Sequence, residues 1–120
     1  MRVFLADDET KVRSAIRLLL EQEVGLSVVG EAAEAADLLK QMRMACADRF
    51  LIDWELPGLD AVKLVSEVRA CCPGAMIVAL SGRPEARLDA LEAGVDFFVS
   101  KAEPPERLLD ALHAGQRLGG

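Results

Sequence analysis

The sequence predicts an α/β domain in which helices cover both faces of a parallel sheet. Five short apolar runs, each bounded by turn residues, alternate with segments whose apolar residues recur at the helical period. Runs that are apolar throughout are typical of parallel strands buried on both faces. Because strand–helix–strand crossovers are right-handed, the helices fall on both sides of the sheet. The predicted architecture is therefore doubly wound, with five β-α units.

The expected strands cover residues 2–6, 26–30, 49–53, 75–80 and 96–99. The first two helices are predicted from one-sided apolar stripes. These stripes consist of Val12, Ala15, Ile16, Leu19 and Leu20 in the first helix, and Ala35, Leu38, Leu39 and Met42 in the second.

Cap and turn residues bound the last three helices. Asp60 is a suitable N-cap for the third helix, which Pro73-Gly74 stops. The fourth is shorter, from Pro84 to Gly94, and Pro104-Pro105 opens the fifth. The apolar residues of these helices are Ala61, Leu64, Val65 and Val68 in the third, Leu88 and Leu91 in the fourth, and the inward-facing Leu108, Leu109 and Leu112 in the fifth.

Length and composition fit one domain. The chain has 120 residues, of which 52% are hydrophobic. We expect the domain to cover residues 1–117, with 118–120 a terminal tail or the start of a linker to an output domain. No apolar run approaches the roughly 20 residues that span a bilayer, so we expect a cytoplasmic protein without a membrane partner. The net charge of −6, without a basic stripe, disfavours direct nucleic-acid binding.

The three cysteines are expected to be structural. Cys46, Cys71 and Cys72 show no CxxC spacing, and the only histidine, His113, lies far along the chain. This pattern disfavours a zinc site. The segment around Cys46 and the segment around Cys71-Cys72 are both predicted to be helical, and small buried thiols are common in helices.

Polar residues follow four of the expected strands: Asp7-Asp8, Asp53, Ser81 and Lys101. Taken singly, each has an ordinary interpretation as a helix cap, a turn residue or a surface lysine. In open α/β sheets, however, sites form outside the carboxyl ends of the strands. Three carboxylates, a hydroxyl and an ammonium would therefore meet at one edge.

This set of groups suits a divalent cation and a transferred phosphoryl group. Neighbouring carboxylates repel unless a cation or proton lies among them. Magnesium prefers six oxygens, which Asp8, Asp53, a backbone carbonyl just after it and waters would supply. A carboxylate such as Asp53 can also act as a nucleophile and form an acyl phosphate. Lys101 would neutralise charge on the phosphoryl group, and Ser81 would donate a hydrogen bond to it.

Over essentially its whole length, the chain resembles the receiver domain of bacterial two-component response regulators. The residues Asp7-Asp8, Asp53, Ser81 and Lys101 match the family's active site in order and spacing. Residues 53–60 (DWELPGLD) resemble the D-x-x-[LM]-P-G-[ML]-D signature, and residues 91–96 (LEAGVD) resemble L-x-A-G-A-x. Residues 28–32 and 101–106 look most like receivers joined to LuxR/NarL-type helix-turn-helix output domains.

The resemblance implies a flavodoxin-like fold with strand order 2-1-3-4-5. It implies that Asp53 accepts a phosphoryl group from a sensor histidine kinase, in a domain that catalyses only its own phosphorylation and dephosphorylation. The implied partners are the kinase and an output domain or target protein that controls transcription, and phosphorylated chains can pair as homodimers. The implied site residues are Asp8, Asp53 and the Glu55 carbonyl for Mg²⁺ or Mn²⁺, Asp7 directly or through water, Ser81 and Phe98 for the switch, and Glu55 and Arg83 for the lifetime of the phosphoryl group.

Two departures from the family pattern lie in the segment that leads to Lys101 and just after it. Ala102 stands where a proline usually follows the lysine, and the interval from Ser81 to Lys101 is about two residues shorter than is typical. Two other functions therefore stay open at this point. One is a receiver-like protein-interaction module that works without phosphorylation, and the other is a small Mg²⁺-dependent phosphohydrolase with Asp53 as nucleophile.

Overall fold

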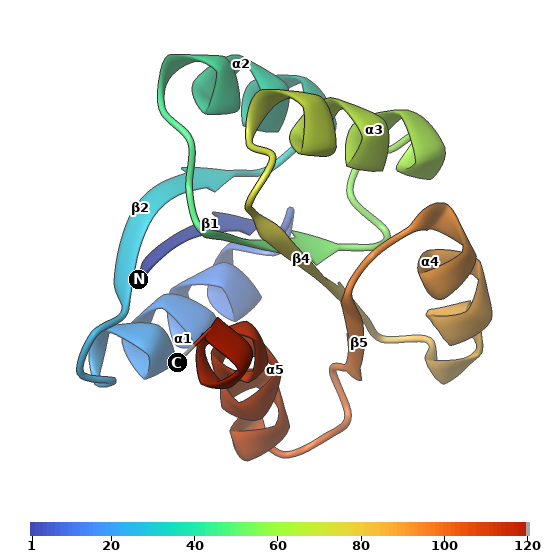
Figure 1. Ribbon diagram of the computed structural model, residues 1–120. Helices are drawn as coiled ribbons and strands as arrows, with labels where there is room; N and C mark the ends of the chain where they lie inside the picture. Colours follow the sequence, from blue (N-terminus) through green and yellow to red (C-terminus); the bar gives the residue numbers. More distant parts are fainter. Residues whose placement is uncertain (120) are drawn as a thin grey trace.

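The computed structural model describes the backbone of residues 1–119 and the side chains of residues 1–114. Five parallel strands form one sheet in the order β2-β1-β3-β4-β5, with helices on both faces (Figure 1). This arrangement confirms the predicted fold class and strand order. The expected tail at 118–120 lies outside the part of the chain whose side chains are described.

The strands and helices alternate along the whole chain. The strands are β1 (Arg2–Ala6), β2 (Ser27–Ala32), β3 (Arg49–Asp53), β4 (Met76–Ser81) and β5 (Phe97–Ser100). The helices are α1 (Thr10–Glu21), α2 (Ala35–Met44), α3 (Ala61–Cys71), the 3-10 turn η1 (Pro84–Ala86), α4 (Arg87–Ala93) and α5 (Pro105–Gly119). None of the described helices is long and apolar enough to cross a bilayer.

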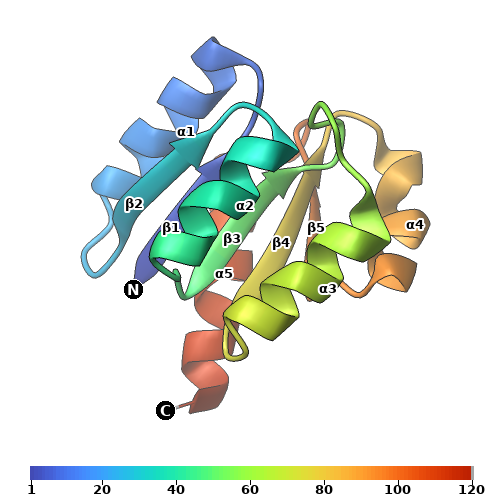
Figure 2. The same cartoon turned by 90° about the horizontal axis from the view of Figure 1, so that it is seen from above.

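The sheet separates two hydrophobic layers, because successive strand residues point to opposite faces. On one face, Phe50 and Ile52 pack with α2, α3 and α4; on the other, Leu51 packs with α1 and α5. Figures 1 and 2 show these two groups of helices on either side of the sheet. The central strands are buried on both faces, which explains why their sequences are apolar throughout.

Local signals set the helix bounds largely as the sequence predicts. The Asp60 side chain caps α3 by accepting a hydrogen bond from the Lys63 amide at 3.2 Å. Gly94 ends α4 at φ 104°, a left-handed conformation that favours glycine.

The segment from Pro84 to Gly94 buries small residues and exposes its two leucines. Leu88 is 65% exposed and Leu91 39% exposed, whereas Ala86 and Ala90 are buried. Ala86 lies in the 3-10 turn η1 and Ala90 in α4, so each of the two elements contributes one alanine to the core. The short segment between Ser81 and Lys101 therefore contacts the sheet through small side chains and leaves two leucines at the surface.

The cysteines correct an expectation from the sequence. Cys46 lies in the loop between α2 and β3 rather than in a helix, and it forms a disulfide with Cys72, the C-cap residue of α3. Cys71 is free and exposed rather than buried. Sequence spacing did not predict the bond, because the two cysteines are 26 residues apart and meet only when α2 and α3 pack side by side.

Candidate functional site

The strand ends bring the predicted polar residues to one edge of the sheet. Asp53 is the last residue of β3 and Ser81 the last of β4. The acidic residues 7–9 follow β1, and Lys101 follows β5. Two backbone hydrogen bonds fix this edge: the Trp54 amide donates to the Leu80 carbonyl, and the Lys101 amide donates to the Ser81 carbonyl, both at 2.7 Å.

Lys101 lies between the buried carboxylates. Its Nζ is 3.1 Å from Asp7 Oδ2 and 3.5 Å from Asp53 Oδ2. Asp7 is fully buried and Asp53 is 2% exposed. Each also accepts a backbone hydrogen bond through Oδ1, from the Glu9 amide at 2.9 Å and from the Glu55 amide at 3.0 Å. The two carboxylates are thus fixed in orientation, with their second oxygens turned toward the ammonium.

The acidic cluster fits a divalent cation. Carboxylate oxygens of Asp7, Asp8 and Asp53 lie within 4.8 Å of one another, with Asp8 exposed to solvent. Asp7 Oδ2 is buried and accepts no hydrogen bond within the described residues, although the Lys101 ammonium is near. A hard cation with oxygen ligands would satisfy this atom and relieve the repulsion among the acids.

Burial perturbs the acid that ends β3. Removal of the Asp53 carboxylate from water raises its pKa from 3.8 to about 6, and the nearby charge of Asp7 adds to the rise. The Glu55 amide and Lys101 oppose the rise but do not cancel it. Burial lowers the pKa of the Lys101 ammonium, but its contacts with Asp7, Asp53 and Glu9 outweigh burial and raise that pKa overall. Lys101 is therefore a cation whose charge offsets only part of the cost of burying the Asp53 carboxylate.

Ser81 and Glu55 form the other side of the site. The Ser81 hydroxyl lies 2.9 Å and 2.8 Å from the two Glu55 carboxylate oxygens and donates to that carboxylate. The Ser81 oxygen in turn accepts from the Arg83 amide at 3.0 Å. The Arg83 guanidinium lies 3.6 Å from Glu55 Oε2, in a contact exposed to solvent. The hydroxyl expected to face a phosphoryl group is thus engaged elsewhere in this state.

Glu9 is a site residue that the sequence analysis did not single out. Its Oε1 lies 3.3 Å from Lys101 Nζ, and its side chain is 62% exposed. The signal for it in the sequence is the acidic run itself, because Glu9 directly follows Asp7-Asp8. Phe98, the predicted switch aromatic, lies on β5 and packs partly buried against the core on the α2, α3 and α4 face.

The family model for the response regulator receiver domain matches residues 3–113. The chain belongs to this family. Sensor kinases are the upstream partners of response regulators, whose output domains contact DNA. Receiver domains generally bind Mg²⁺ at an acidic pocket of this kind.

The relatives place the receiver in the LuxR/NarL subclass. The response regulator UvrY of Escherichia coli is 31% identical over 98% of this chain and 56% of its own length. The nitrate/nitrite response regulator protein NarL of Escherichia coli is 28% identical over 92% of this chain and 52% of its own length. The chain spans about half the length of the curated relatives it matches.

Solved structures agree with this assignment. A LuxR-family two-component response regulator from Aurantimonas superimposes with a TM-score of 0.85 at 31% identity, covering 94% of this chain and 82% of that one. RcsB from Salmonella enterica, bound to a promoter in the presence of the phosphomimetic BeF3⁻, gives a TM-score of 0.84 at 29% identity, over 98% of this chain and 60% of that one.

Proposed function

We propose that this receiver is a phosphorylation-controlled switch that accepts a phosphoryl group on Asp53 from a sensor histidine kinase and controls transcription through an output domain. The observation that supports the proposal best is the buried pair of Asp53 and Asp7, bridged by the Lys101 ammonium at the carboxyl edge of the sheet. This edge is where open α/β folds bind their ligands.

In the proposed transfer, an oxygen of the Asp53 carboxylate attacks phosphorus, and the bond from phosphorus to the donor imidazole nitrogen breaks. Lys101 neutralises charge on the phosphoryl oxygens, because its ammonium already faces the Asp53 carboxylate at 3.5 Å. Mg²⁺, or Mn²⁺ in its place, would offset the negative charge of the acids and the phosphoryl group. Its ligands would be Asp8, Asp53 and the Glu55 carbonyl, with Asp7 bound directly or through water.

The switch in this proposal begins with a hydrogen bond that must break. Ser81 donates to Glu55 in the unphosphorylated chain, and it would turn to the phosphoryl oxygens once they arrive. Phosphorylation adds about −1.5 to −2 charges, which gives Ser81 and Lys101 a new shared partner. Phe98 would change its burial as β4 and β5 adjust. Glu55, released from Ser81, would keep its contact with Arg83 and cover the acyl phosphate against water.

The kinase would approach beside α1. A groove of about 480 Å³ lies between α1 and α5 and reaches Lys101, with Leu18, Leu19 and Leu108 among its lining residues. Leu18 is 61% exposed. We expect Leu18→Asp to slow phosphoryl transfer from a sensor kinase while leaving the rate with acetyl phosphate unchanged.

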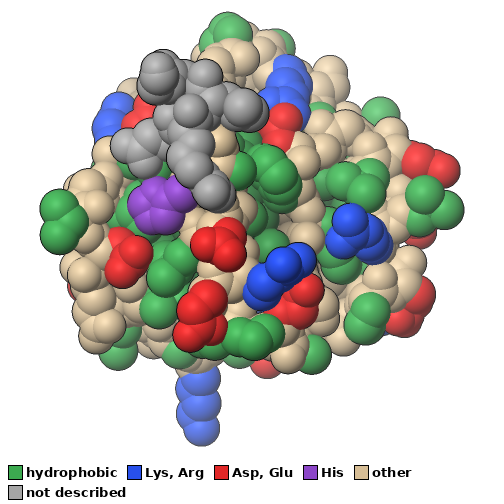
Figure 3. Space-filling model, turned by 60° about the horizontal axis from the view of Figure 1, so that its bottom comes forward, with side chains coloured by type: hydrophobic (Ala, Val, Ile, Leu, Met, Phe, Trp, Pro, Cys, Tyr) green, Lys and Arg blue, Asp and Glu red, His purple; other side chains and the backbone are tan. Residues whose placement is uncertain are grey.

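The proposed DNA contact belongs to an output domain rather than to this one. Figure 3 shows acidic, basic and hydrophobic side chains interspersed on the lower face of Figure 1, and the Lys and Arg side chains of the described residues do not gather there. Binding to the phosphate backbone of DNA needs clustered basic residues, and the net charge is −6. We propose a cytoplasmic location, as for response regulators in general, and pairing of phosphorylated chains as homodimers.

The test of the proposed function is intact-mass measurement after incubation with acetyl phosphate, with and without Mg²⁺. We expect the wild type to gain one phosphoryl group only when Mg²⁺ is present, and Asp53→Ala to gain none. Asp48→Ala, which removes an aspartate near the start of β3, is the matched control and should gain one. A gain by Asp53→Ala equal to that of the wild type would refute the assignment. Turnover of a phosphate ester beyond one equivalent would favour the phosphohydrolase instead.

A further inference from the structure

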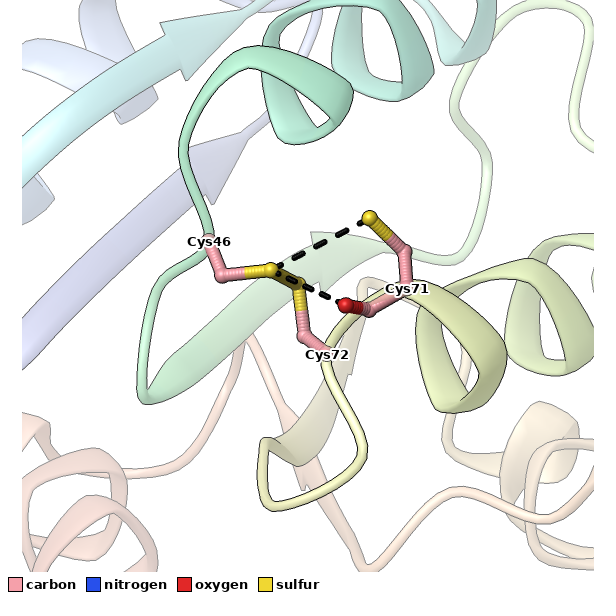
Figure 4. A group of neighbouring side chains, drawn as sticks. All are labelled: Cys46, Cys71 and Cys72. Carbon is pink, nitrogen blue, oxygen red and sulfur yellow. Dashed lines mark hydrogen bonds between the residues drawn. A yellow bond between two sulfur atoms is a disulfide. The ribbon is translucent and has the colours of Figure 1, made fainter.

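Three sulfur atoms meet where α2 and α3 end (Figure 4). Cys46 follows α2, Cys71 is the last residue of α3, and Cys72 caps that helix. Cys46 and Cys72 are joined as a disulfide, with their Cα atoms 5.7 Å apart. The free Sγ of Cys71 lies 3.9 Å from Cys46 Sγ, and the three sulfurs all lie within 4.8 Å of one another. A disulfide needs two cysteines, so the third sulfur calls for another explanation.

The cluster is separate from the phosphoryl site. Cys46 lies three residues before β3 and Cys72 four residues before β4, at the amino ends of strands whose carboxyl ends present Asp53 and Ser81. The two sites thus lie at opposite ends of the same strands. Substitutions at one can therefore be tested without removing residues of the other.

The reduced thiols have backbone acceptors close by. The cluster lies at the carboxyl ends of α2 and α3, where the last carbonyls of a helix lack partners within the helix. Two backbone carbonyls also approach the sulfurs: the Cys71 carbonyl lies 3.2 Å from Cys46 Sγ, and the Met42 carbonyl lies 3.7 Å from Cys71 Sγ. The contact between Cys46 and the Cys71 carbonyl becomes a hydrogen bond only when Cys46 is a reduced thiol.

We propose that the reduced cluster is a three-thiolate binding site for one soft or borderline divalent cation of the Zn²⁺ and Cd²⁺ class. Two sulfurs bound to one Zn²⁺ through tetrahedral bonds of about 2.3 Å lie roughly 3.8 Å apart. The separation of 3.9 Å between Cys46 and Cys71 already matches that spacing. Cys72 completes the triangle when it separates from Cys46, and solvent fills the fourth position on the exposed side of Cys71.

The chemistry balances in two steps. A dithiol reductant supplies two electrons and two protons, which convert the disulfide into two thiols while the reductant becomes a cyclic disulfide. The three thiols then release three protons as their sulfurs bind one divalent cation. Response regulators typically work in the cytoplasm, where thiols are kept reduced and clustered cysteines more often bind metals than form lasting disulfides.

The experiment uses the whole chain, reduced with a dithiol, desalted without oxygen and titrated with Cd²⁺ in saturating Mg²⁺. Sulfur-to-cadmium charge-transfer absorption reports thiolate ligands and does not respond to carboxylates. We expect one Cd²⁺ per chain, binding at least tenfold weaker in Cys71→Ser, and wild-type binding in Asp53→Asn. Because Cys71 is exposed and outside the disulfide, its replacement by serine should not disturb folding.

A second readout uses air oxidation followed by thiol counting. Bound Zn²⁺ should keep three thiols in the wild type during exposure to air, whereas the chain without metal should return to one thiol. The proposal is overturned if the reduced wild type shows no charge-transfer absorption. It is also overturned if Cys71→Ser binds Cd²⁺ as tightly as the wild type, or if Zn²⁺ does not slow disulfide formation. Those outcomes would identify the cluster as a disulfide beside an unrelated thiol.

Discussion

Replacement of Asp53 by asparagine should stabilise the unphosphorylated chain at neutral pH when no divalent cation is present. The carboxylate is 2% exposed and lies near Asp7, and its pKa is raised from 3.8 to about 6. A group whose pKa is higher in the folded state binds more protons there than in the unfolded state. The stabilising contribution of Asp53 is complete below pH 3.8 and is lost as the pH rises through about 6.

The size of the effect follows from the pKa. At about 1.4 kcal/mol for each pH unit, the rise from 3.8 to about 6 corresponds to about 3 kcal/mol. The pKa of about 6 already contains the opposing attraction of Lys101. The free-energy difference therefore also accounts for the loss of that attraction in the variant. Above pH 7 we therefore expect Asp53→Asn to exceed the wild type in free energy of unfolding by up to about 3 kcal/mol, with the advantage vanishing near pH 4.

The assay is urea unfolding at several pH values in the presence of a chelator, followed by the fluorescence of Trp54. Asp110→Asn, which removes an exposed carboxyl on α5, serves as the matched control and should follow the wild-type profile. Adding Mg²⁺ should stabilise the wild type more than Asp53→Asn. The reasoning is refuted if the difference between Asp53→Asn and the wild type is the same at pH 4 and pH 8.

Four further predictions concern the site and the sheet. Lys101→Met should lower the rate of phosphorylation by acetyl phosphate by about 10²-fold, as expected for loss of one charge-stabilising group; an unchanged rate in intact-mass time courses would contradict the role of the lysine. Glu55→Ala should hasten loss of the phosphoryl group, and a wild-type rate of dephosphorylation would mean that the contact between Glu55 and Arg83 does not exclude water. Mg²⁺ should change the fluorescence of Trp54, and an unchanged emission while calorimetry shows binding would argue against a cation at Asp53. Gly30→Ala should cost about 1–3 kcal/mol of stability, because its Cβ would lie 2.4 Å from Phe4 Cε2; an unchanged urea midpoint would show that the Phe4 ring moves aside freely.

The sequence predicted the fold and the strand ends well because both depend on strong, local patterns. The apolar runs before Asp7, Asp53 and Ser81 are long enough to be identified as buried strands, and parallel strands must bring their carboxyl ends to one edge. The apolar run before Lys101 likewise predicted its position at the same edge of the sheet. The comparisons then confirmed the receiver family and its LuxR/NarL subclass.

Features that depend on side-chain conformation or on packing between distant segments were not predictable from the sequence. The hydrogen bond from Ser81 to Glu55 depends on the direction that the glutamate takes after β3. The bond between Cys46 and Cys72 depends on how two helix ends meet. The exposure of Leu88 depends on which face the short helix α4 turns toward the core, and two leucines do not specify that face.

The central claim is that the Asp53 carboxylate becomes an acyl phosphate. Borohydride reduces acyl phosphates, so treatment of the phosphorylated chain should convert the modified aspartate to homoserine, which peptide mapping by mass spectrometry locates. We predict homoserine at position 53 alone, and only after incubation with both acetyl phosphate and Mg²⁺. Homoserine at another aspartate, or none in a chain that has gained a phosphoryl mass, would contradict the account.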